Sequence, residues 1–396
     1  MKKTIRDYDL EGKRVIIRCD YNVPIQNGII QDDTRIVASL ETIKYAIGRG
    51  ARVILLSHLG KIKEKSDVIK NNLYPVSVRL GELLEQPVFF SEKTRGSELE
   101  EMVSSLENGD VLLIQNTRYE DLEGKKESSC DKELARYWAS LGDIFINDAY
   151  GTSHRAHASN VGIGKILPNG IGFLVEKEVQ KLDEIMNEET HPFVVIMGGS
   201  KVSDKIQVIE NLILKCDKLL IGGGMAYTFL KAKGYDVGHS ILDEESLDFC
   251  QQILEKYAGK FVLPIDHVVA SSLDSDCCFV KESDCMDHQD MGLDIGPKTI
   301  NLFCQELIGA QRVIMNGPMG CFENSKYAKG TKAIYDFIAK HQIKTLIGGG
   351  DSAAAVNQLS NPALFYHIST GGGATLEYLE GKELPGISVI HEKEEV

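Results

Sequence analysis

In the first half of the chain, short apolar runs end in polar side chains that could bind a small anion. The residues at the ends of these runs are Asp20, Asn22, His58, Asn116, Arg118, Asn147 and Asp148, and Arg35 and Arg155 lie on nearby loops. An arginine guanidinium presents paired N–H donors to two oxygens of a carboxylate or phosphate, and histidine adds a further donor. All arginines except Arg312 lie in this half. We therefore expect the first half to bind a small hydroxylated anion.

In the second half, the apolar runs end in glycine clusters. The clusters are at 198–199, 222–224, 317–318 (Gly-Pro), 348–350 and 371–373. Glycine lets the backbone approach a ligand closely, and the start of a following helix offers free N–H groups to phosphate. A single cluster is typical of a tight turn, but their repetition in one half of the chain favours a bound nucleotide.

The segment GGSKVSDK contains a lysine pair, Lys201 and Lys205. On a helix, this spacing places both side chains on one face. The pair is typical of a solvated surface, but beside glycine clusters it also fits two ammonium groups that contact phosphate oxygens.

Common nucleotide-binding motifs are absent or incomplete. The sequence has no GxxxxGK[ST] P-loop and no HRD or DFG motif of protein kinases. Residues 348–353, GGGDSA, match the dinucleotide pattern GxGxxG/A, so a dehydrogenase is an alternative. That pattern requires an acidic residue about 20 positions later, and no Asp or Glu occurs from Ser352 to Thr375. The dehydrogenase is therefore the weaker hypothesis.

The apolar runs alternate with stretches of helical composition. The runs begin at residues 14, 52, 110 and 143 in the first half and at 193, 218, 312, 345 and 365 in the second. Nearly continuous apolar strands that alternate with helices form parallel sheets covered on both faces. We expect an α/β fold with two doubly wound, Rossmann-like lobes, joined by a helix and separated by a cleft.

The expected domain boundaries follow from this pattern. Residues 1–172 form the first lobe, and 173–189 form an amphipathic connecting helix before His191-Pro192. Residues 190–375 form the second lobe. Residues 376–396 are too short for a domain, so we expect them to return to the first lobe.

Length, charge and cysteine content argue against several classes of protein. The chain has 396 residues and a formal net charge of −14, which disfavours a nucleic-acid binder or an anionic-membrane binder. It has no apolar run long enough to span a membrane and no export signal at its start. The nine cysteines form no CxxC pair, so we expect reduced thiols and a cytoplasmic enzyme.

A set of longer motifs occurs in order along essentially the whole chain. The motifs are RCDYNVP, SHLG, NDAYGTSHRAHAS, GGSKVSDK, IGGGMAYTFL, MGLDIGP, NGPMGCFE, GGGDSAAA and STGGGATLEYLEGKELPG. Together they resemble the phosphoglycerate kinase family. The resemblance implies reversible, Mg²⁺-dependent transfer of a phosphoryl group from 1,3-bisphosphoglycerate to ADP, giving 3-phosphoglycerate and ATP in glycolysis. It also implies a monomer whose lobes close about a hinge for in-line transfer.

The same resemblance implies roles for individual residues. The phosphoglycerate would be held by Asp20, Asn22, Arg35, His58, Lys61, Arg118 and Arg155. The nucleotide would be held by Lys201, Lys205, Gly222, Gly223, Gly292, Leu293, Asn316, Pro318, Glu323, Gly349, Gly350, Asp351 and Ser352, with Asp351 also the Mg²⁺ ligand. The catalytic residues, which compensate charge on the transferring group, would be Arg35, Lys201, Gly371, Gly372 and Gly373.

Two segments depart from the family pattern. The family usually has HLGR where this chain has Lys61 in HLGK, and QNTRY replaces the commoner ENLRF. Lysine is a point charge, whereas arginine binds an anion through two donors. We therefore expect an effect on substrate affinity from Lys61, while Arg118 in QNTRY is retained.

Other hypotheses about the function have less support from the sequence. His154 and His157 have a spacing that could bind a metal, but anion binding through Arg155 explains the segment better. A two-lobed solute-binding protein would share the α/β lobes, although such proteins normally carry an export signal. Binding of MgADP but not NAD would favour the kinase over the dehydrogenase.

Overall fold

The chain forms two compact units. The structure is a computed structural model that describes residues 1–393. The first unit comprises residues 1–180 and the C-terminal segment that begins at Glu383, and the second comprises residues 181–382. The expected tail of 376–396 therefore belongs to both units. Residues 376–382 are part of the second unit, and the tail joins the first unit only from Glu383. Residues 394–396 of that tail lie outside the described residues.

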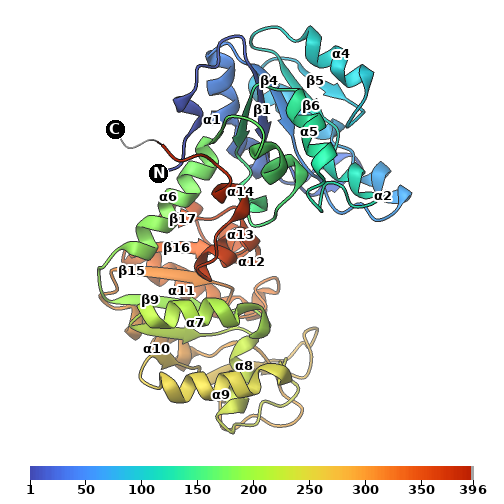
Figure 1. The fold of residues 1–396 in the computed structure, drawn as a ribbon. Coiled ribbons are helices and arrows are strands. Elements are labelled where there is room, and N and C mark those ends of the chain that lie inside the picture. The colour runs from blue at the N-terminus through green and yellow to red at the C-terminus, as the bar shows by residue number, and fades with distance from the viewer. Residues whose placement is uncertain (394–396) are drawn as a thin grey trace. The chain divides into compact units, whose positions relative to one another are not determined.

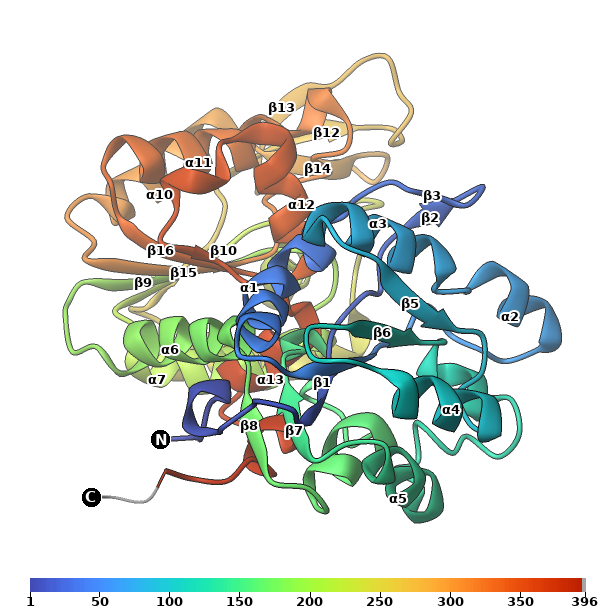
Figure 2. The same cartoon turned by 90° about the horizontal axis from the view of Figure 1, so that it is seen from above.

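The first unit contains a six-stranded parallel sheet in the order β5-β6-β4-β1-β7-β8. Its strands are β1 (Arg14–Arg18), β4 (Arg52–Leu56), β5 (Val88–Ser91), β6 (Val111–Ile114), β7 (Ile144–Asn147) and β8 (Asn169–Ile171). Its helices are α1 (Thr34–Gly48), α2 (Lys65–Lys70), α3 (Tyr74–Leu84), α4 (Ser97–Ser105), α5 (Lys132–Ser140) and α14 (Pro385–Ser388). Figure 2 shows α1 and α3 on one face of this sheet and α4 and α5 on the other.

The position of β1 in this sheet predicts where a ligand binds. β1 pairs with β4 on one side and with β7 on the other, so the chain leaves β1 and β7 in opposite directions. In open parallel sheets, such a reversal opens a crevice beyond the carboxyl ends of the strands. β1, β4 and β7 are almost entirely buried because helices cover both faces.

The second unit contains a second six-stranded parallel sheet, in the order β11-β10-β9-β15-β16-β17 (Figure 1). Its strands are β9 (Phe193–Met197), β10 (Lys218–Ile221), β11 (Phe261–Val262), β15 (Arg312–Asn316), β16 (Lys344–Gly348) and β17 (His367–Ile368). Its helices are α7 (Ile206–Lys215), α8 (Met225–Ala232), α9 (Leu247–Lys256), α10 (Pro297–Leu307), α11 (Lys329–Lys340), α12 (Gly350–Leu359) and α13 (Gly372–Leu379). The reversal of strand order lies at β9, between β10 and β15. Both sheets confirm the predicted doubly wound α/β class.

The second unit also contains a three-stranded antiparallel sheet, β13-β12-β14, that the sequence analysis did not predict. The strands are β12 (Asp266–Ala270), β13 (Phe279–Glu282) and β14 (Met291–Ile295). Their sequences mix acidic and apolar residues, and β13 is largely accessible to solvent. A pattern chosen for continuous apolar runs does not detect such strands. The short hairpin β2 (Ile25–Gln26) and β3 (Ile29–Ile30) was missed for the same reason.

Helix α6 (Phe173–Asn187) begins in the first unit and ends in the second. Its first turn is anchored by Asp148, whose Oδ1 accepts hydrogen bonds from the amides of Leu174 at 2.9 Å and Val175 at 3.4 Å. Arg6 pairs with Glu176 at 2.6 Å. The two hydrogen bonds to Asp148 satisfy amides that have no partner within the helix. Asp148, which follows an apolar strand, therefore serves the fold of the first unit.

We expect Asp148→Asn to stabilise the protein at pH 8 more than at pH 4.5. Burial raises the pKa of Asp148 to about 7, despite hydrogen bonds from Thr42 and two backbone amides. Between pH 4 and 7 the unfolded state therefore binds fewer protons than the folded state, and the free energy of unfolding falls as pH rises. Asparagine removes this loss. In melting curves, the increase in melting temperature caused by Asp148→Asn should be ~5 °C larger at pH 8 than at pH 4.5.

The control for this prediction is Asp143→Asn. Asp143 has a pKa lowered by its hydrogen bonds with Arg14, so its carboxylate is ionised at both pH values and its removal should cost about the same stability at pH 8 as at pH 4.5. An equal change at both pH values for Asp148→Asn would contradict the prediction.

Candidate active site

In the first unit, the loop after β1 and helix α1 place Asp20 and Arg35 in contact. The Asp20 carboxylate lies 2.9 Å from Arg35 Nη1, which also donates to the carbonyl of Asn22 at 3.3 Å. Asn22 Oδ1 accepts a hydrogen bond from the Gly60 amide at 2.9 Å. The side chain of Arg35 is 36% exposed, so the part of its guanidinium that Asp20 leaves free can contact a ligand.

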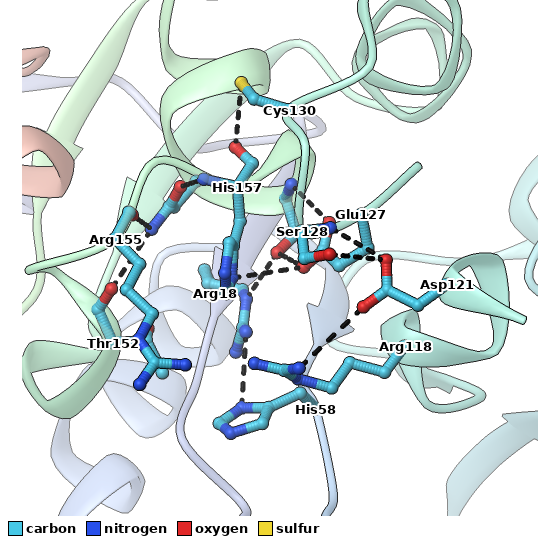
Figure 3. Close-up of polar contacts among 12 residues, drawn as sticks. Arg18, His58, Arg118, Asp121, Glu127, Ser128, Cys130, Thr152, Arg155 and His157 are labelled. Atoms are coloured by element: carbon cyan, nitrogen blue, oxygen red, sulfur yellow. Dashed lines mark hydrogen bonds and ion pairs between the residues drawn. The ribbon is translucent and has the colours of Figure 1, made fainter. Parts of the chain in front are cut away.

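His58, Arg118 and Arg155 converge on one region of the first unit (Figure 3). Arg118 lies in the short helix η2 (Thr117–Asp121), and its closest carboxylate contact is Asp121 at 3.8 Å. Within residues 1–393, Arg118 Nε and the Nδ1 atoms of His154 and His157 are buried without a hydrogen-bond partner. Buried polar groups are normally satisfied. Orphaned nitrogens among arginines therefore fit a site that an anion completes.

The histidines near these arginines are held neutral. Burial, followed by the charges of Arg18 and Arg118, lowers the pKa of His157 to about 3. Burial and then Arg18 also lower the pKa of His58 well below its usual value. Neutral imidazole has one N–H donor and one acceptor. The positive charge available to an anion therefore comes from the arginines, while the histidines contribute hydrogen bonds.

Two other residues at strand ends hold the fold rather than face a ligand. Asn116 Nδ2 donates to the carbonyls of Leu59 at 2.7 Å and Asn71 at 2.9 Å. Asn147 Nδ2 donates to the carbonyl of Gly386 at 2.7 Å. Because these amides are used by backbone groups, a polar residue after a strand is not by itself a ligand contact.

In the second unit, the loops after β9, β10 and β15 surround a cavity of about 400 Å³. Several residues predicted to bind nucleotide line it, namely Gly223, Gly292, Leu293, Pro318, Glu323 and Asp351. The remaining lining includes Tyr227, Ile241, Leu273, Met291, Met319 and Phe322, which the sequence analysis missed. An apolar lining with a few polar groups is typical of a site for a planar base.

Glycine is required at position 223 of this cavity. Gly223 has φ +62°, and a Cβ atom there would lie 2.6 Å from the amide nitrogen of Gly199. The close approach of these two loops leaves backbone in the wall of the cavity. Gly222, which precedes it, does not line the cavity.

The two lysines do not share a helical face, so that prediction is wrong. Lys201 is exposed in the segment before the short helix η5 (Ser203–Lys205), and α7 begins only at Ile206. Lys205 Nζ instead donates to the carbonyls of Gly198 at 2.5 Å and Asn316 at 3.0 Å. Burial lowers the pKa of Lys205 to about 8. Lys205 is thus built into the strand ends, while Lys201 is free to reach solvent.

Helices α12 and α13 begin close together. A Cβ atom on Gly372 would lie 3.2 Å from the Gly350 amide nitrogen, and Gly371 precedes α13 directly. Asn316 Nδ2, buried without a partner among the described residues, would lie 3.2 Å from a Cβ on Gly349. Helix N-termini carry free amides and a positive dipole end. This corner therefore suits a phosphate.

Ser352, another predicted nucleotide residue, has a structural contact instead. Its Oγ accepts a hydrogen bond from the Gly317 amide at 2.6 Å, and the residue is fully buried. It holds the loop after β15 against the first turn of α12. Gly373 follows in the first turn of α13 and is exposed.

The chain matches the model of the phosphoglycerate kinase family over residues 5–382. The chain belongs to this family. The phosphoglycerate kinase of Enterococcus faecalis is 55% identical over 99% of this chain and 100% of that protein. That of Staphylococcus aureus is 53% identical over the same shares. Family membership identifies the chain as a phosphotransferase of glycolysis.

Solved structures of the family share the fold. The phosphoglycerate kinase of Coxiella burnetii superposes with a TM-score of 0.87 at 38% identity, and that of Pyrococcus horikoshii with 0.85 at 30%. Both comparisons cover 98% of each chain.

Among residues 1–393, no helix has the length and apolar character to cross a bilayer.

Proposed function

We propose that this phosphoglycerate kinase family member binds phosphoglycerate on its first unit and MgADP or MgATP on its second. The observation that carries the assignment is that the chain holds both an arginine-rich site with orphaned nitrogens and a cavity lined by the first turn of α12, near which α13 also begins. The first suits a small anion, and the second suits a base with its phosphates.

In this proposal, the phosphoglycerate is held by Asp20, Asn22, Arg35, His58, Lys61, Arg118 and Arg155. The guanidinium groups bind phosphate and carboxylate oxygens through paired donors, whereas Asp20 and Asn22 accept or donate to hydroxyl and carboxyl groups. Asp20 also holds Arg35 at 2.9 Å. The substrate would therefore bind to an arginine whose position Asp20 already fixes.

The nucleotide residues are Lys201, Lys205, Gly222, Gly223, Gly292, Leu293, Asn316, Pro318, Glu323, Gly349, Gly350, Asp351 and Ser352. The structural observations that support a nucleotide contact differ among these residues. Cavity residues such as Leu293 and Pro318 would flank the base and Glu323 the ribose. Lys205, Asn316 and the amides of Gly349 and Gly350 would face the phosphates. Ser352 contributes by holding the Gly317 loop.

Asp351 is the proposed ligand for Mg²⁺. Its exposed carboxylate stands in the first turn of α12 and lines the cavity. Mg²⁺ commonly takes one or two carboxylates and completes its shell with phosphate oxygens and water. Within residues 1–393 no cluster of three His, Cys, Asp or Glu could hold a metal, which agrees with a site that phosphates complete. When bound, the ion would neutralise phosphate charge.

Phosphoryl transfer requires alignment and charge compensation more than covalent chemistry. In the proposed reaction a β-phosphate oxygen of ADP attacks the acyl phosphate, and the bond from phosphorus to the carboxyl oxygen breaks. Arg35, Lys201 and the amides of Gly371, Gly372 and Gly373 would stabilise the charge on the moving group. Because the two sets of residues belong to different units, transfer would require hinge closure that also excludes water.

The test is ADP formation from ATP with and without 3-phosphoglycerate and Mg²⁺. A dehydrogenase that consumes 1,3-bisphosphoglycerate and NADH would draw the reaction forward, and absorbance of NADH would report it. Activity should depend on both 3-phosphoglycerate and Mg²⁺. Activity without 3-phosphoglycerate, or stabilisation by NAD instead of MgADP, would contradict the proposal.

The proposal includes a monomer in the cytoplasm. Both sets of binding residues lie in one chain, so no second copy is needed to complete them. ATP and ADP are available in the cytoplasm, and the acidic net charge of −14 gives no reason to expect a nucleic-acid or membrane partner.

We expect Lys61→Arg to lower the KM for 3-phosphoglycerate, by less than about tenfold, or to leave it unchanged. Lys61 is exposed and lines a cavity of about 700 Å³ together with Arg118. Arginine adds a paired donor where lysine offers a point charge. Initial rates at saturating MgATP would measure the effect. Lys63→Arg, in the same cavity, is the control, and a clear rise in KM for Lys61→Arg would contradict the prediction.

A further inference from the structure

A buried carboxylate lies behind the arginine-rich site of the first unit. Glu127 is fully buried, and its Oε2 accepts a hydrogen bond from the Ser159 amide at 3.0 Å. Its Oε1 accepts the Ser159 hydroxyl at 2.5 Å. The segment that carries Ser159 is the single turn η4 (Ala158–Gly162). Burying a carboxylate is costly unless a positive group compensates it.

Arg18 supplies that compensation. It is the last residue of β1 and is fully buried, and its Nε donates to Ser159 Oγ at 2.8 Å. The Ser159 hydroxyl therefore donates to Glu127 and accepts from Arg18, so it joins the two charges. Burial lowers the pKa of Arg18, and Glu127 is the largest influence that raises it. Glu127 thus favours the charged form of Arg18.

Arg18 in turn contacts His58, one of the proposed phosphoglycerate residues. Arg18 Nη2 lies 3.4 Å from His58 Nδ1 (Figure 3). Because arginine can only donate, Nδ1 must accept, and the proton of the neutral imidazole resides on Nε2. The contact therefore leaves His58 Nε2–H as the donor available to a substrate oxygen.

We propose that Glu127 is a positioning residue for phosphoglycerate. Through Ser159 it fixes the Arg18 guanidinium, and Arg18 fixes the tautomer of His58. Glu127 itself is shielded from solvent and does not touch substrate. The inference rests on the proposed function, because it assumes that His58 contacts phosphoglycerate.

The test is Glu127→Gln, which keeps the shape and removes the charge. We expect the KM for 3-phosphoglycerate to rise about tenfold, as for residues that orient a ligand-binding histidine, while the KM for ATP changes less than about twofold. An unchanged KM for 3-phosphoglycerate would overturn the proposal. A fall in this KM would also overturn it, since it would mean that Glu127 only repels the anionic substrate.

A second variant, Ser159→Ala, tests the route and covers the case in which Glu127→Gln folds poorly. It should raise the same KM in the same direction. If Glu127 acts through Ser159, the double variant should be no worse than Glu127→Gln alone, because linked residues are not additive. Effects that multiply would overturn the proposed route.

A tautomer measurement separates positioning from general loss of stability. Nitrogen-15 NMR of histidine-labelled protein, with His58→Gln for assignment, should place the proton of His58 on Nε2 in the parent. Glu127→Gln should give a mixture of tautomers, and a resonance unchanged from the parent would overturn the inference.

Asp266→Asn is the matched control. Asp266 is a fully buried carboxylate of the second unit whose Oδ1 accepts from Thr299 Oγ1 at 2.7 Å. Its loss should lower the melting temperature without changing the KM for 3-phosphoglycerate. If the parent enzyme itself fails to use 3-phosphoglycerate, the proposed function is wrong. If the parent is active and the KM of Glu127→Gln equals that of the parent, only the inference about Glu127 is wrong.

Discussion

Arg35→Met should lower kcat by about 10²-fold to 10³-fold, because a fixed donor to the transferring phosphoryl group is lost. Asp20 holds Arg35 Nη1 at 2.9 Å, and the side chain remains 36% exposed. Its guanidinium is therefore both positioned and accessible. Methionine keeps much of the side-chain length but provides neither charge nor donors. Rates at saturating ATP and 3-phosphoglycerate would measure kcat directly.

Arg79→Met is the matched control for this prediction. Arg79 belongs to the same unit, pairs with Asp33 at 2.8 Å and is 39% exposed, but it lies outside the proposed site. Its loss should leave kcat within about twofold. If both variants lose activity equally, the effect comes from the charge of the unit and not from Arg35. If Arg35→Met keeps its kcat, the catalytic role is wrong.

Lys205→Met should raise the KM for MgATP about 10²-fold and abolish stabilisation by MgADP in melting curves. Lys205 Nζ is held by the carbonyls of Gly198 and Asn316, at the ends of two strands that border the cavity. Its ammonium group is therefore fixed where nucleotide phosphates are proposed to bind. The KM for 3-phosphoglycerate should change little, since the substrate residues lie in the other unit.

The pH dependence gives a second measure of Lys205. Burial lowers its pKa to about 8, from an unfolded value of about 10.4. As pH rises through 8 the ammonium loses its proton, so the KM for MgATP should rise by up to about tenfold per pH unit. The free energy of unfolding should rise from pH 8 to 10, because the unfolded state then binds more protons. Lys205→Met should lose both trends.

Lys260→Met separates nucleotide binding from stability. Lys260 Nζ also donates to two carbonyls of the second unit, those of Ile213 and Cys216, both at 2.8 Å. Its loss should lower the melting temperature with no change in the KM for MgATP. An equal rise in that KM for both lysine variants would contradict a specific role of Lys205.

The parallel class of both sheets was predictable from the sequence, whereas the order of their strands came only from the structure. Runs such as RVIIR and FVVIM are buried on both faces, and only a sheet covered by helices tolerates such continuous apolar strands. The residues after these strands were also found by sequence, because carboxyl ends of parallel strands share one edge. For this reason the positions of Asp20, His58 and Pro318 at the ends of strands were predictable from the sequence.

The antiparallel sheet and the contacts within the sites required the tertiary structure. Asn147 and Asp148 look like ligands in sequence, yet one binds the carbonyl of Gly386 and the other the start of α6. Spacing also placed Lys201 and Lys205 on one helical face, whereas the helix begins after them. Sequence gives the type of a side chain, but its partner depends on which distant backbone groups the fold brings near.

Arg18 illustrates this division most clearly. Its place at the end of an apolar strand is visible in sequence, but its burial is seen only in the structure, and a buried charge requires a partner. That partner, Glu127, lies in an irregular segment with no periodic pattern, and the bridge between them is a hydroxyl from a third segment. Strand positions follow from local apolar patterns, whereas the pairing of buried charges depends on long-range packing that no local pattern encodes.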